Sequence, residues 1–265
     1  MSVHGAHANG VRIDYDDQGS GEPALLFLTG WCSSRERWEK VAERASGRRR
    51  VLSFDWRGHG RSDPAPGDFG VDELVEDALA VVEASGVETF VPCAASHSGW
   101  VALELRRQLG ERVPGLVHAD WMLAVPSERY LEVIRHLDSS DWEEARDTLF
   151  RIWAAGVDTA DIREVLGVMD RHGEAMWRRS GREIGASYAA EGCPLDAFER
   201  LEPPLPVLHA YGQPHDPEYL ELQRRFAVEH DWFTVLKLDA TTHFAMLEEA
   251  PRLADAIEAF VSETR

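Results

Sequence analysis

The chain has 265 residues, which suits one large α/β domain and is short for two. Hydrophobic residues make up 44% and charged residues 28%, so the composition is that of a globular protein and excludes disordered and coiled-coil classes. Asp and Glu outnumber Lys and Arg by 47 to 28, and the net charge of −19 would repel phosphate backbones and anionic lipids. We therefore expect neither a nucleic acid nor a membrane as a partner.

The sequence also indicates a cellular compartment. No apolar run approaches the ~20 residues that span a bilayer, and the first residues, MSVHGAHANG, lack the basic-then-apolar pattern of a secretory signal. The cysteines Cys32, Cys93 and Cys193 form no CxxC pair, which suits a reducing environment and disfavours a disulfide framework or a zinc site. These features predict a cytoplasmic enzyme or binding protein.

Short apolar runs alternate with amphipathic stretches along the chain. Several of the runs are apolar on both faces, as buried parallel strands are. The predicted strands are Ala24–Leu28, Val51–Phe54, Glu88–Cys93, Leu116–Ala119, Leu205–Tyr211 and Phe233–Leu238.

Helices are predicted between these strands. Asp72 is the expected N-cap of a helix that ends at Gly86, a second helix runs from about Gly99 to Leu109, and the last begins near Pro251. Strands and helices that alternate in this way predict a mostly parallel central sheet with helices on both faces, an α/β fold.

Residues 126–204 depart from this alternation. They contain helical patterns, no convincing buried strand, and Trp142, Trp153 and Trp177. We interpret them as a helical cap insertion over the carboxyl edge of the sheet, where open α/β sheets bind ligands. The tryptophans belong either to the interior of the cap or to an aromatic pocket. Residues 1–125 and 205–265 then form the core of a single compact domain.

The strongest local signal is the segment CAASHSGW, residues 93–100. It follows a predicted strand and opens a predicted helix, and small residues stand two places before and after Ser96. This is the arrangement of a nucleophile elbow, a strained turn that exposes one serine hydroxyl. Ala94 and Ser98 stand where glycine is usual, so by itself the segment also fits an ordinary strand-to-helix turn.

Other segments support the elbow interpretation. Residues 54–62, FDWRGHGRS, resemble the DxRGxGxS segment of the α/β-hydrolase fold, and Gly30-Trp31 stands where that fold supplies a backbone N–H to an oxyanion hole. Thr242-His243-Phe244 follows the last predicted strand, at the place of the catalytic histidine. The sequence therefore predicts an α/β-hydrolase fold with Ser96 and His243 in its site.

A histidine that acts as a base needs a carboxylate to orient it. Asp216 follows the predicted strand 205–211, where many hydrolases of this fold keep their acid, but one place later than the usual offset. Asp120 ends the preceding predicted strand. The spacing alone leaves both candidates open.

A family resemblance covers nearly the whole chain, from about Ile13 to Phe260. The motifs GWC (30–32), SHSGW (96–100), DW (120–121) and THF (242–244) together resemble the cofactor-free 3-hydroxy-4(1H)-quinolone 2,4-dioxygenases. The resemblance implies ring cleavage by dioxygen to an N-acylanthranilate and carbon monoxide, with no metal, flavin or other cofactor. The implied partners are a small aromatic N-heterocycle and dioxygen, and we expect a monomer or a weak homodimer.

The resemblance also implies roles for individual residues. His243 and Asp120 form the general base, and Ser96 orients the substrate rather than attacking it. The backbone N–H groups of Trp31 and His97 stand near the developing oxyanion. Independently of the resemblance, we expect Trp153, as one of the aromatic residues of the cap, to bind the substrate. The His97 side chain either shapes the dioxygen cavity or is structural. In the family the position of Asp216 commonly carries Glu, which speaks against a catalytic role there.

The sequence departs from the family in the expected pocket. Ala95 and Ser33 or Ser34 stand where members carry histidine, and Ser98 stands where they carry glycine. These changes concern substrate specificity, including the 2-substituent, rather than reaction class.

Three other interpretations compete with this one. A serine esterase would use Ser96, His243 and Asp120 or Asp216, and a non-catalytic relative would only bind a ligand. A non-haem iron oxygenase needs two histidines and a carboxylate in facial geometry, whereas the histidines here are scattered, with His4 and His7 expected in a mobile, solvated tail.

Overall fold

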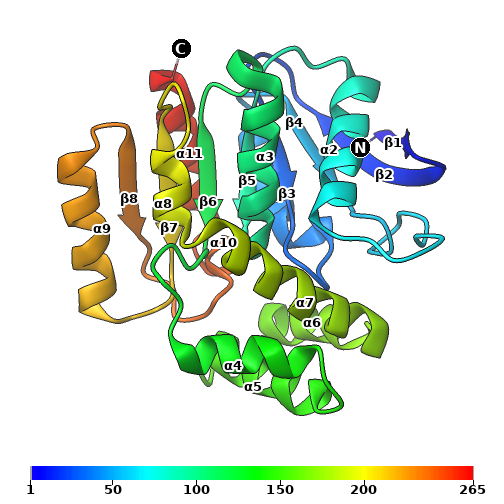
Figure 1. Ribbon diagram of the computed structural model, residues 1–265. Coiled ribbons are helices and arrows are strands. Elements are labelled where there is room, and N and C mark those ends of the chain that lie inside the picture. Colours follow the sequence, from blue (N-terminus) through cyan, green and yellow to red (C-terminus); the bar gives the residue numbers. More distant parts are fainter. Residues whose placement is uncertain (1, 265) are drawn as a thin grey trace.

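The computed structural model describes residues 2–264 (Figure 1). Their centre is a sheet of eight strands in the order β1-β2-β4-β3-β5-β6-β7-β8. Strands β3 to β8 run parallel to one another, while β2 is antiparallel to β4 and to β1. The mostly parallel sheet predicted from the sequence is therefore confirmed.

The strands are β1 (Ser2–Ala8), β2 (Val11–Gln18), β3 (Ala24–Leu28), β4 (Val51–Phe54), β5 (Phe90–Ala95), β6 (Leu116–Ala119), β7 (Val207–Tyr211) and β8 (Phe233–Lys237). The α-helices are α1 (Glu39–Ser46), α2 (Val71–Ser85), α3 (Gly99–Leu109), α4 (Glu128–Leu137), α5 (Trp142–Ala154), α6 (Ala160–Asp170), α7 (Glu174–Glu191), α8 (Pro194–Glu199), α9 (Pro217–Glu229), α10 (Ala245–Glu248) and α11 (Ala250–Glu263). Three 3₁₀ turns are η1 (Arg35–Trp38), η2 (Ser96–Ser98) and η3 (Gly110–Arg112).

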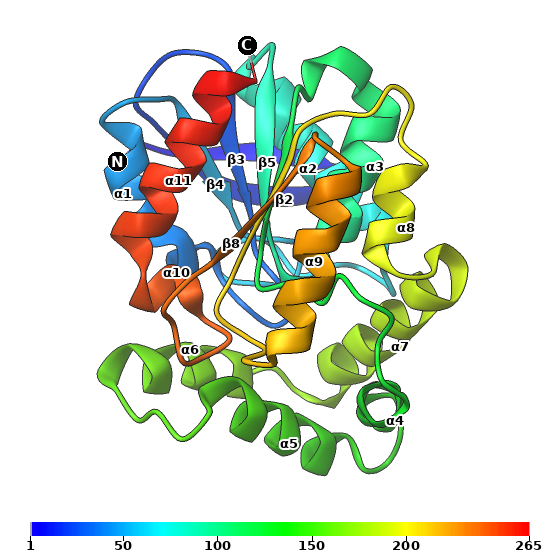
Figure 2. The same ribbon diagram turned by 90° about the vertical axis from the view of Figure 1, so that its left-hand side faces the viewer.

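The central strands are buried because helices cover both faces of the sheet. Every residue of β3, β5, β6 and β7 is buried. Helices α1 and α11 lie on one face, and α2, α3 and α9 lie on the other (Figure 2). Two covered faces explain why these strands are continuous apolar runs without alternation.

Some predicted boundaries are displaced. Strand β5 begins at Phe90 and continues to Ala95, two residues later at each end than the sequence suggested. The N–H groups of Glu88 and Thr89 donate instead to the Glu22 carboxylate, which keeps both residues outside the ladder. Helix α2 is capped by Gly70 and not by Asp72, because the Glu73 carboxylate turns back to accept the N–H of Gly70.

The prediction of a mobile tail at the amino terminus was wrong. His4 and His7 lie in β1, which pairs with β2 in a hairpin, although both side chains are exposed. Asn9 and Gly10 form the turn with φ of 48° and 85°. Asn-Gly between two strands is a strong hairpin signal because both turn positions require positive φ, and this signal was present in the sequence.

Residues 126–204 carry helices α4 to α8 and no strand within that range. Helices α4, α5, α6 and α7 lie beyond the carboxyl ends of the parallel strands (Figure 1). Helices α4 and α7 pack closely because Gly181 has no side chain, and a Cβ there would stand 2.5 Å from Cβ of Leu137. The division into core and cap at residues 126 and 204 stays a prediction. Within residues 2–264, no helix combines the length and apolarity that a membrane span requires.

Two buried histidines face each other across β6 and β7 and make the stability sensitive to pH. His118 and His209 are register partners, and burial lowers the pKa of both, that of His209 to about 4. Neither nitrogen of His118 has a hydrogen-bond partner among the described residues. Both rings therefore stay neutral in the folded protein, whereas in the unfolded chain they take up protons below about pH 6.5.

We expect the free energy of unfolding to fall as the pH drops from 7 toward 4, because the unfolded state then binds more protons. Each histidine contributes at most about 1.4 kcal/mol per pH unit in that window. Urea unfolding of His118→Leu should show a shallower loss between pH 7 and pH 5 than the wild type, while the exposed His136→Gln control should not. An equal slope for His118→Leu and the wild type would contradict this account.

Candidate active site

The site lies where the strand order reverses. Strand β3 has β4 on one side and β5 on the other, so the loops that leave the carboxyl ends of β3 and β5 diverge there. Open α/β sheets bind ligands at such a point. The loop after β3 carries Gly30 and Trp31, and the turn after β5 carries Ser96.

Ser96 sits in a strained turn between β5 and α3. Its φ is 55°, in the left-handed region that disfavours side chains. The hydroxyl of Ser98 donates to the carbonyl oxygens of Ala95 and Leu28, at 2.8 and 3.2 Å, which joins the ends of β5 and β3. A serine in this place of the motif thus has a structural use that glycine would lack.

The start of α3 depends on Gly99. A Cβ on Gly99 would lie 2.3 Å from the ring of Trp121, which follows Asp120 at the end of β6. Trp121 is buried and meets Trp100 edge to face, with ring centroids 4.8 Å apart. The SHSGW and DW motifs are therefore in contact, because the Trp121 indole of the DW motif occupies the space beside Gly99 of the SHSGW motif.

A neutral histidine holds the loop after β3. Cys32, with φ of 59°, donates its backbone N–H to Nε2 of His59 at 3.0 Å, and Nδ1 of His59 lies 2.9 Å from the carbonyl oxygen of Arg57. Because Nε2 accepts, Nδ1 carries the proton and donates it. Burial lowers the pKa of His59 to about 3, so the ring keeps this acceptor at neutral pH.

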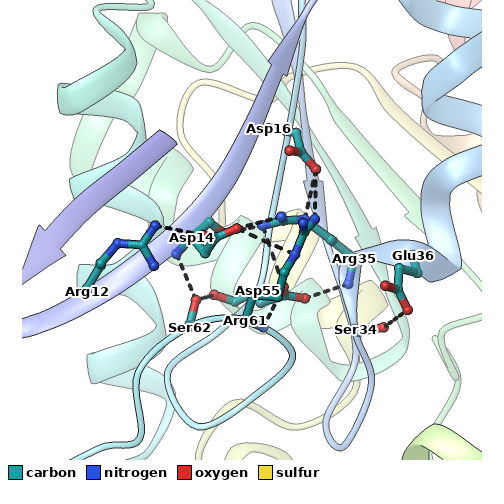
Figure 3. Close-up of polar contacts among 9 residues, drawn as sticks. All are labelled: Arg12, Asp14, Asp16, Ser34, Arg35, Glu36, Asp55, Arg61 and Ser62. Atoms are coloured by element: carbon teal, nitrogen blue, oxygen red, sulfur yellow. Dashed lines mark hydrogen bonds and ion pairs between the residues drawn. The ribbon is translucent and has the colours of Figure 1, made fainter. Parts of the chain in front are cut away.

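A buried ion cluster around Arg35 joins the same loop to the sheet (Figure 3). Nε of Arg35 lies 2.9 Å from Asp16, and its two terminal nitrogens pair with Asp14 and Asp55. Its backbone N–H also donates to Asp55 at 2.8 Å. Breaking a buried pair leaves an uncompensated charge that costs about 3–5 kcal/mol, so the cluster fixes the loop against β2 and β4.

His243 follows β8 and faces the cap. Its ring stacks on that of Trp153, with centroids 5.3 Å apart and planes 17° from parallel, and its backbone N–H donates to the Trp153 carbonyl oxygen at 2.9 Å. Burial first, and then the nearby guanidinium of Arg37, lower the pKa of His243 well below its usual value. The imidazole is therefore neutral at neutral pH.

Asp120 binds the loops on either side of it. Oδ1 accepts the N–H groups of Gly212 at 2.7 Å and Gln213 at 3.4 Å, and Oδ2 accepts that of Ala245 at 2.9 Å. Burial raises the pKa of Asp120 although these bonds and Arg37 oppose the rise. Among the described residues no hydrogen bond joins this carboxylate to the His243 ring. The Asp120 carboxylate instead contacts the histidine loop through the backbone N–H of Ala245.

Asp216 has a different role. Its side chain is exposed, and Oδ1 accepts the N–H of Glu218 at 2.9 Å as the N-cap of α9. A carboxylate that caps a helix at the surface is poorly placed to orient a buried imidazole.

An enclosed cavity lies between core and cap. Its core wall includes Trp31, Arg37, Ser96, His97 and His243. Its cap wall is mostly apolar and consists of Tyr130, Ile134, Leu137, Leu149, Trp153, Met169, Trp177, Ser180 and Ile184. The free volume of about 30 Å³ holds little more than one water molecule. A larger ligand therefore requires side chains of the cap to move.

The predicted residues differ in where they lie relative to the cavity. Trp31, Ser96, His97, Trp153 and His243 line the cavity, and Asp120 lies behind it. Trp177 lines it as well, whereas Trp142 packs under the guanidinium of Arg146. Ala95 and Ser98 are buried in the elbow and do not line the cavity, and Ser33 and Ser34 line a neighbouring groove. The expectation that all of these departures touch the pocket therefore needs correction.

Arg37 and Tyr130 were not found from the sequence. Tyr130 comes from α4 and its hydroxyl lies 2.8 Å from Nε2 of His97, so cap and elbow meet in one hydrogen bond. Burial lowers the pKa of His97 to about 3, which keeps that ring neutral. Neither residue stands in a motif, and only the packing of the cap on the loops brings them to the cavity. Within residues 2–264 no three His, Cys, Asp or Glu side chains are grouped as a metal site.

Comparisons with known proteins identify the relatives of this chain. A family model described as alpha/beta hydrolase fold matches residues 23–232. A 2-heptyl-3-hydroxy-4-quinolone dioxygenase of Rhodococcus erythropolis is 37% identical over 97% of both chains. The 1H-3-hydroxy-4-oxoquinoline 2,4-dioxygenase of Pseudomonas putida is 33% identical over 96% of this chain and 98% of its own. A solved structure of the dioxygenase AqdC, a variant in complex with its substrate, the Pseudomonas quinolone signal, superposes with a TM-score of 0.93 at 31% identity, covering 99% of this chain and all of that one.

The two candidate carboxylates can be separated by mutation. Asp120→Asn replaces one carboxylate oxygen, which accepts backbone N–H groups, with an NH₂ group that cannot accept them. The loop that carries His243 is then held less firmly, and we expect turnover to fall on the order of 10²-fold or more. Asp216→Ala removes a helix cap, which should cost about 0.5–2 kcal/mol of stability but leave turnover nearly unchanged. Steady-state rates and urea midpoints of both variants test this. A larger loss of turnover in Asp216→Ala would return the catalytic role to that residue.

Proposed function

The chain belongs to the 3-hydroxy-4-quinolone 2,4-dioxygenases with the α/β-hydrolase fold, and from this premise we propose that it opens the heterocyclic ring of a 3-hydroxy-4(1H)-quinolone with dioxygen. The observation that carries the proposal is a neutral imidazole, His243, in the wall of an enclosed cavity whose cap side is apolar and aromatic. A flat bicyclic enol with one acidic hydroxyl fits that combination. The apolar cap side chains suit hydrogen, methyl or a longer alkyl group at carbon 2.

The reaction begins with a proton transfer. His243 takes the proton of the 3-hydroxyl group, and the electron pair stays on the substrate, whose ring becomes electron-rich enough to reduce dioxygen. The peroxide bound at carbon 2 attacks carbon 4, and the bridged peroxide collapses. Carbon 3 leaves as carbon monoxide, and both oxygen atoms of dioxygen remain in the N-acylanthranilate. The substrate itself supplies the electrons, so the step requires no metal or organic cofactor.

The surrounding residues support this base. Stacking on Trp153 fixes the plane of the His243 ring. Asp120, held by three backbone N–H groups, supplies a negative charge near the imidazolium as it forms and positions the loop through Ala245. A general base must be unprotonated before it can take up a proton, and burial provides that form of His243.

Ser96, Trp31 and His97 surround the expected position of the substrate oxygens. The Trp31 N–H has no acceptor among the described residues, and that of His97 lies in the first turn of a helix, where N–H groups lack intrahelical partners. These two N–H groups stabilise the oxyanion, and the Ser96 hydroxyl orients it. The His97 ring closes the cavity on the cap side through Tyr130.

We place the enzyme in the cytoplasm as a monomer or weak homodimer. The three cysteines are free and buried, which suits a reducing compartment. The net charge of −19 disfavours anionic partners.

The base and the serine should respond differently to truncation. We expect His243→Ala to lower turnover by about 10²–10⁴-fold. Ser96→Ala should lose only about 1.5–3 kcal/mol of transition-state binding, the contribution of one hydrogen bond to a charged group. Oxygen uptake with a 3-hydroxy-4-quinolone measures both, and hydrolysis of a nitrophenyl ester is the comparison reaction. A serine hydrolase would instead lose nearly all turnover in either variant.

Isotope labelling distinguishes the two chemistries directly. With ¹⁸O₂ in unlabelled water, we expect two labelled oxygen atoms in the N-acylanthranilate and none in the carbon monoxide. Intact-mass spectra during turnover should show no acyl group on Ser96. Label that arrives from water, or a trapped Ser96 adduct, would contradict the dioxygenase mechanism for this chain.

A further inference from the structure

Arg37 brings a buried positive charge to the wall of the cavity. The residue belongs to η1 and is 5% exposed. Its Nη2 donates to the carbonyl oxygen of His243 at 3.1 Å, its Nε lies 3.3 Å from the sulfur of Met246, and the guanidinium lies 4.7 Å from the centre of the Phe244 ring. All three contacts are with the loop that carries the base.

The remaining nitrogen of Arg37, Nη1, lies near Gly30 in the loop after β3. A Cβ built on Gly30 would lie 3.5 Å from the carbonyl oxygen of Ala95, 3.6 Å from Cβ of Ser96 and 3.7 Å from Nη1 of Arg37, so all three atoms lie around Gly30. Among residues 2–264, Nη1 has no hydrogen-bond acceptor, and no carboxylate lies within 4.0 Å of the guanidinium. The buried cation thus keeps unpaired donor hydrogens on Nη1, and it lines the same cavity as Gly30 and Ser96.

The other buried arginines of the described chain have carboxylates or several carbonyl groups as partners. Arg35, Arg49 and Arg57 each pair with a carboxylate, and Arg106 donates to three backbone carbonyl groups. A buried charge normally has such partners because desolvation is costly. Arg37 has instead a sulfur, one carbonyl and an aromatic face, which leaves room for an anion.

We propose that Arg37 is a catalytic residue of the ring cleavage, and that its guanidinium binds the oxyanion formed on the substrate when His243 takes up the proton of the 3-hydroxyl group. The inference rests on the proposed function and adds to it the group that holds the charge of the reactive anion. No bond other than the O–H bond of the substrate breaks in this step, and the proton moves to the imidazole.

Charge balance in the closed cavity supports this role. The ionisable groups that face the space are His243 and His97, both neutral, Tyr130, whose pKa burial raises, and Asp120 behind the histidine loop. After proton transfer there are two anions, the substrate and Asp120. Imidazolium and guanidinium supply the two cations. Without Arg37 the cavity would hold one unbalanced negative charge.

The position of the Arg37 charge decides whether it favours proton transfer from the substrate to His243. A guanidinium lowers the pKa of the base as well as that of the substrate hydroxyl, so it favours transfer only if it lies nearer to the oxyanion than to the imidazole. Arg37 donates to the backbone carbonyl of His243 and not to its ring, and it lines the cavity together with Ser96, where the substrate oxygens are expected. Burial lowers the pKa of Arg37 only to about 10, so it remains charged at neutral pH.

The test is the ionisation of bound substrate without oxygen. Wild type, Arg37→Met and Arg37→Lys are titrated anaerobically with 3-hydroxy-2-methyl-4(1H)-quinolone, and the absorbance of the anion is followed against pH. We expect the apparent pKa of the bound hydroxyl to rise by about one to three pH units in Arg37→Met, as for loss of an opposite charge within a few ångströms. Arg37→Lys should restore part of the shift, and kcat should fall about 10²–10³-fold in Arg37→Met.

Two controls separate this role from a structural one. Arg44→Met removes an exposed cation that pairs with Asp255 and should leave the ionisation of bound substrate unchanged. The ring without the 3-hydroxyl, 2-methyl-4(1H)-quinolone, should bind Arg37→Met and wild type with similar Kd. If Arg37→Met weakens this neutral compound equally, or loses turnover with no change in the bound pKa, Arg37 only holds the loop and the proposal is overturned.

The proposed function has its own readout in the same experiment. Wild-type protein exposed to oxygen must consume it and release carbon monoxide from the same quinolone. Absence of that reaction refutes the proposed function, whereas the anaerobic ionisation shift still decides whether Arg37 binds the anion.

Discussion

The site depends on one buried carboxylate. Asp120 lies at the end of β6 with φ of 49°, and its two oxygens accept backbone N–H groups from the loop after β7 and from the residues after His243. Those N–H groups belong to segments outside the sheet ladder and would otherwise be buried without partners, at about 1–3 kcal/mol each. The carboxylate therefore holds in one arrangement the loops that strands β6, β7 and β8 deliver to the same edge. The strained backbone of Asp120 persists because these bonds determine it.

Strain at this edge is concentrated in the residues that shape the cavity. Three non-glycine residues with positive φ, namely Cys32, Ser96 and Asp120, each end a loop or strand beside it. Each is held by neighbours that lie far away in sequence, Cys32 by His59, Ser96 through Ser98, and Asp120 by its loops. Left-handed conformations cost on the order of 1–3 kcal/mol for such residues, and the buried hydrogen bonds around them offset that cost.

The low polarity of the cavity sets the charge states of the groups that line it and strengthens the interactions between charges. Low polarity around His243 and His97 keeps both rings neutral. The same low polarity strengthens the field of Arg37 and of Asp120, because charges interact more strongly away from water. A site built in this way can generate an anion from a weakly acidic hydroxyl and keep water from it while dioxygen reacts. The free volume of about 30 Å³ is too small for a bicyclic ring, so side chains of the cap have to move before such a substrate enters.

The sequence by itself determined the class of fold, the place of most strands, and the residues Ser96, His243 and Trp31, because each of these depends on a local pattern. An apolar run, a small-residue turn or a motif can be read from neighbouring letters. Asn9-Gly10 also indicates the hairpin of β1 and β2 from the sequence, although a mobile tail was predicted there. Only the tertiary structure decided that Asp120 binds backbone groups and that Asp216 caps a helix. It alone brought Arg37 and Tyr130 to the cavity that Trp153 also lines, because these contacts join residues that lie tens to hundreds of positions apart and depend on how cap and sheet pack.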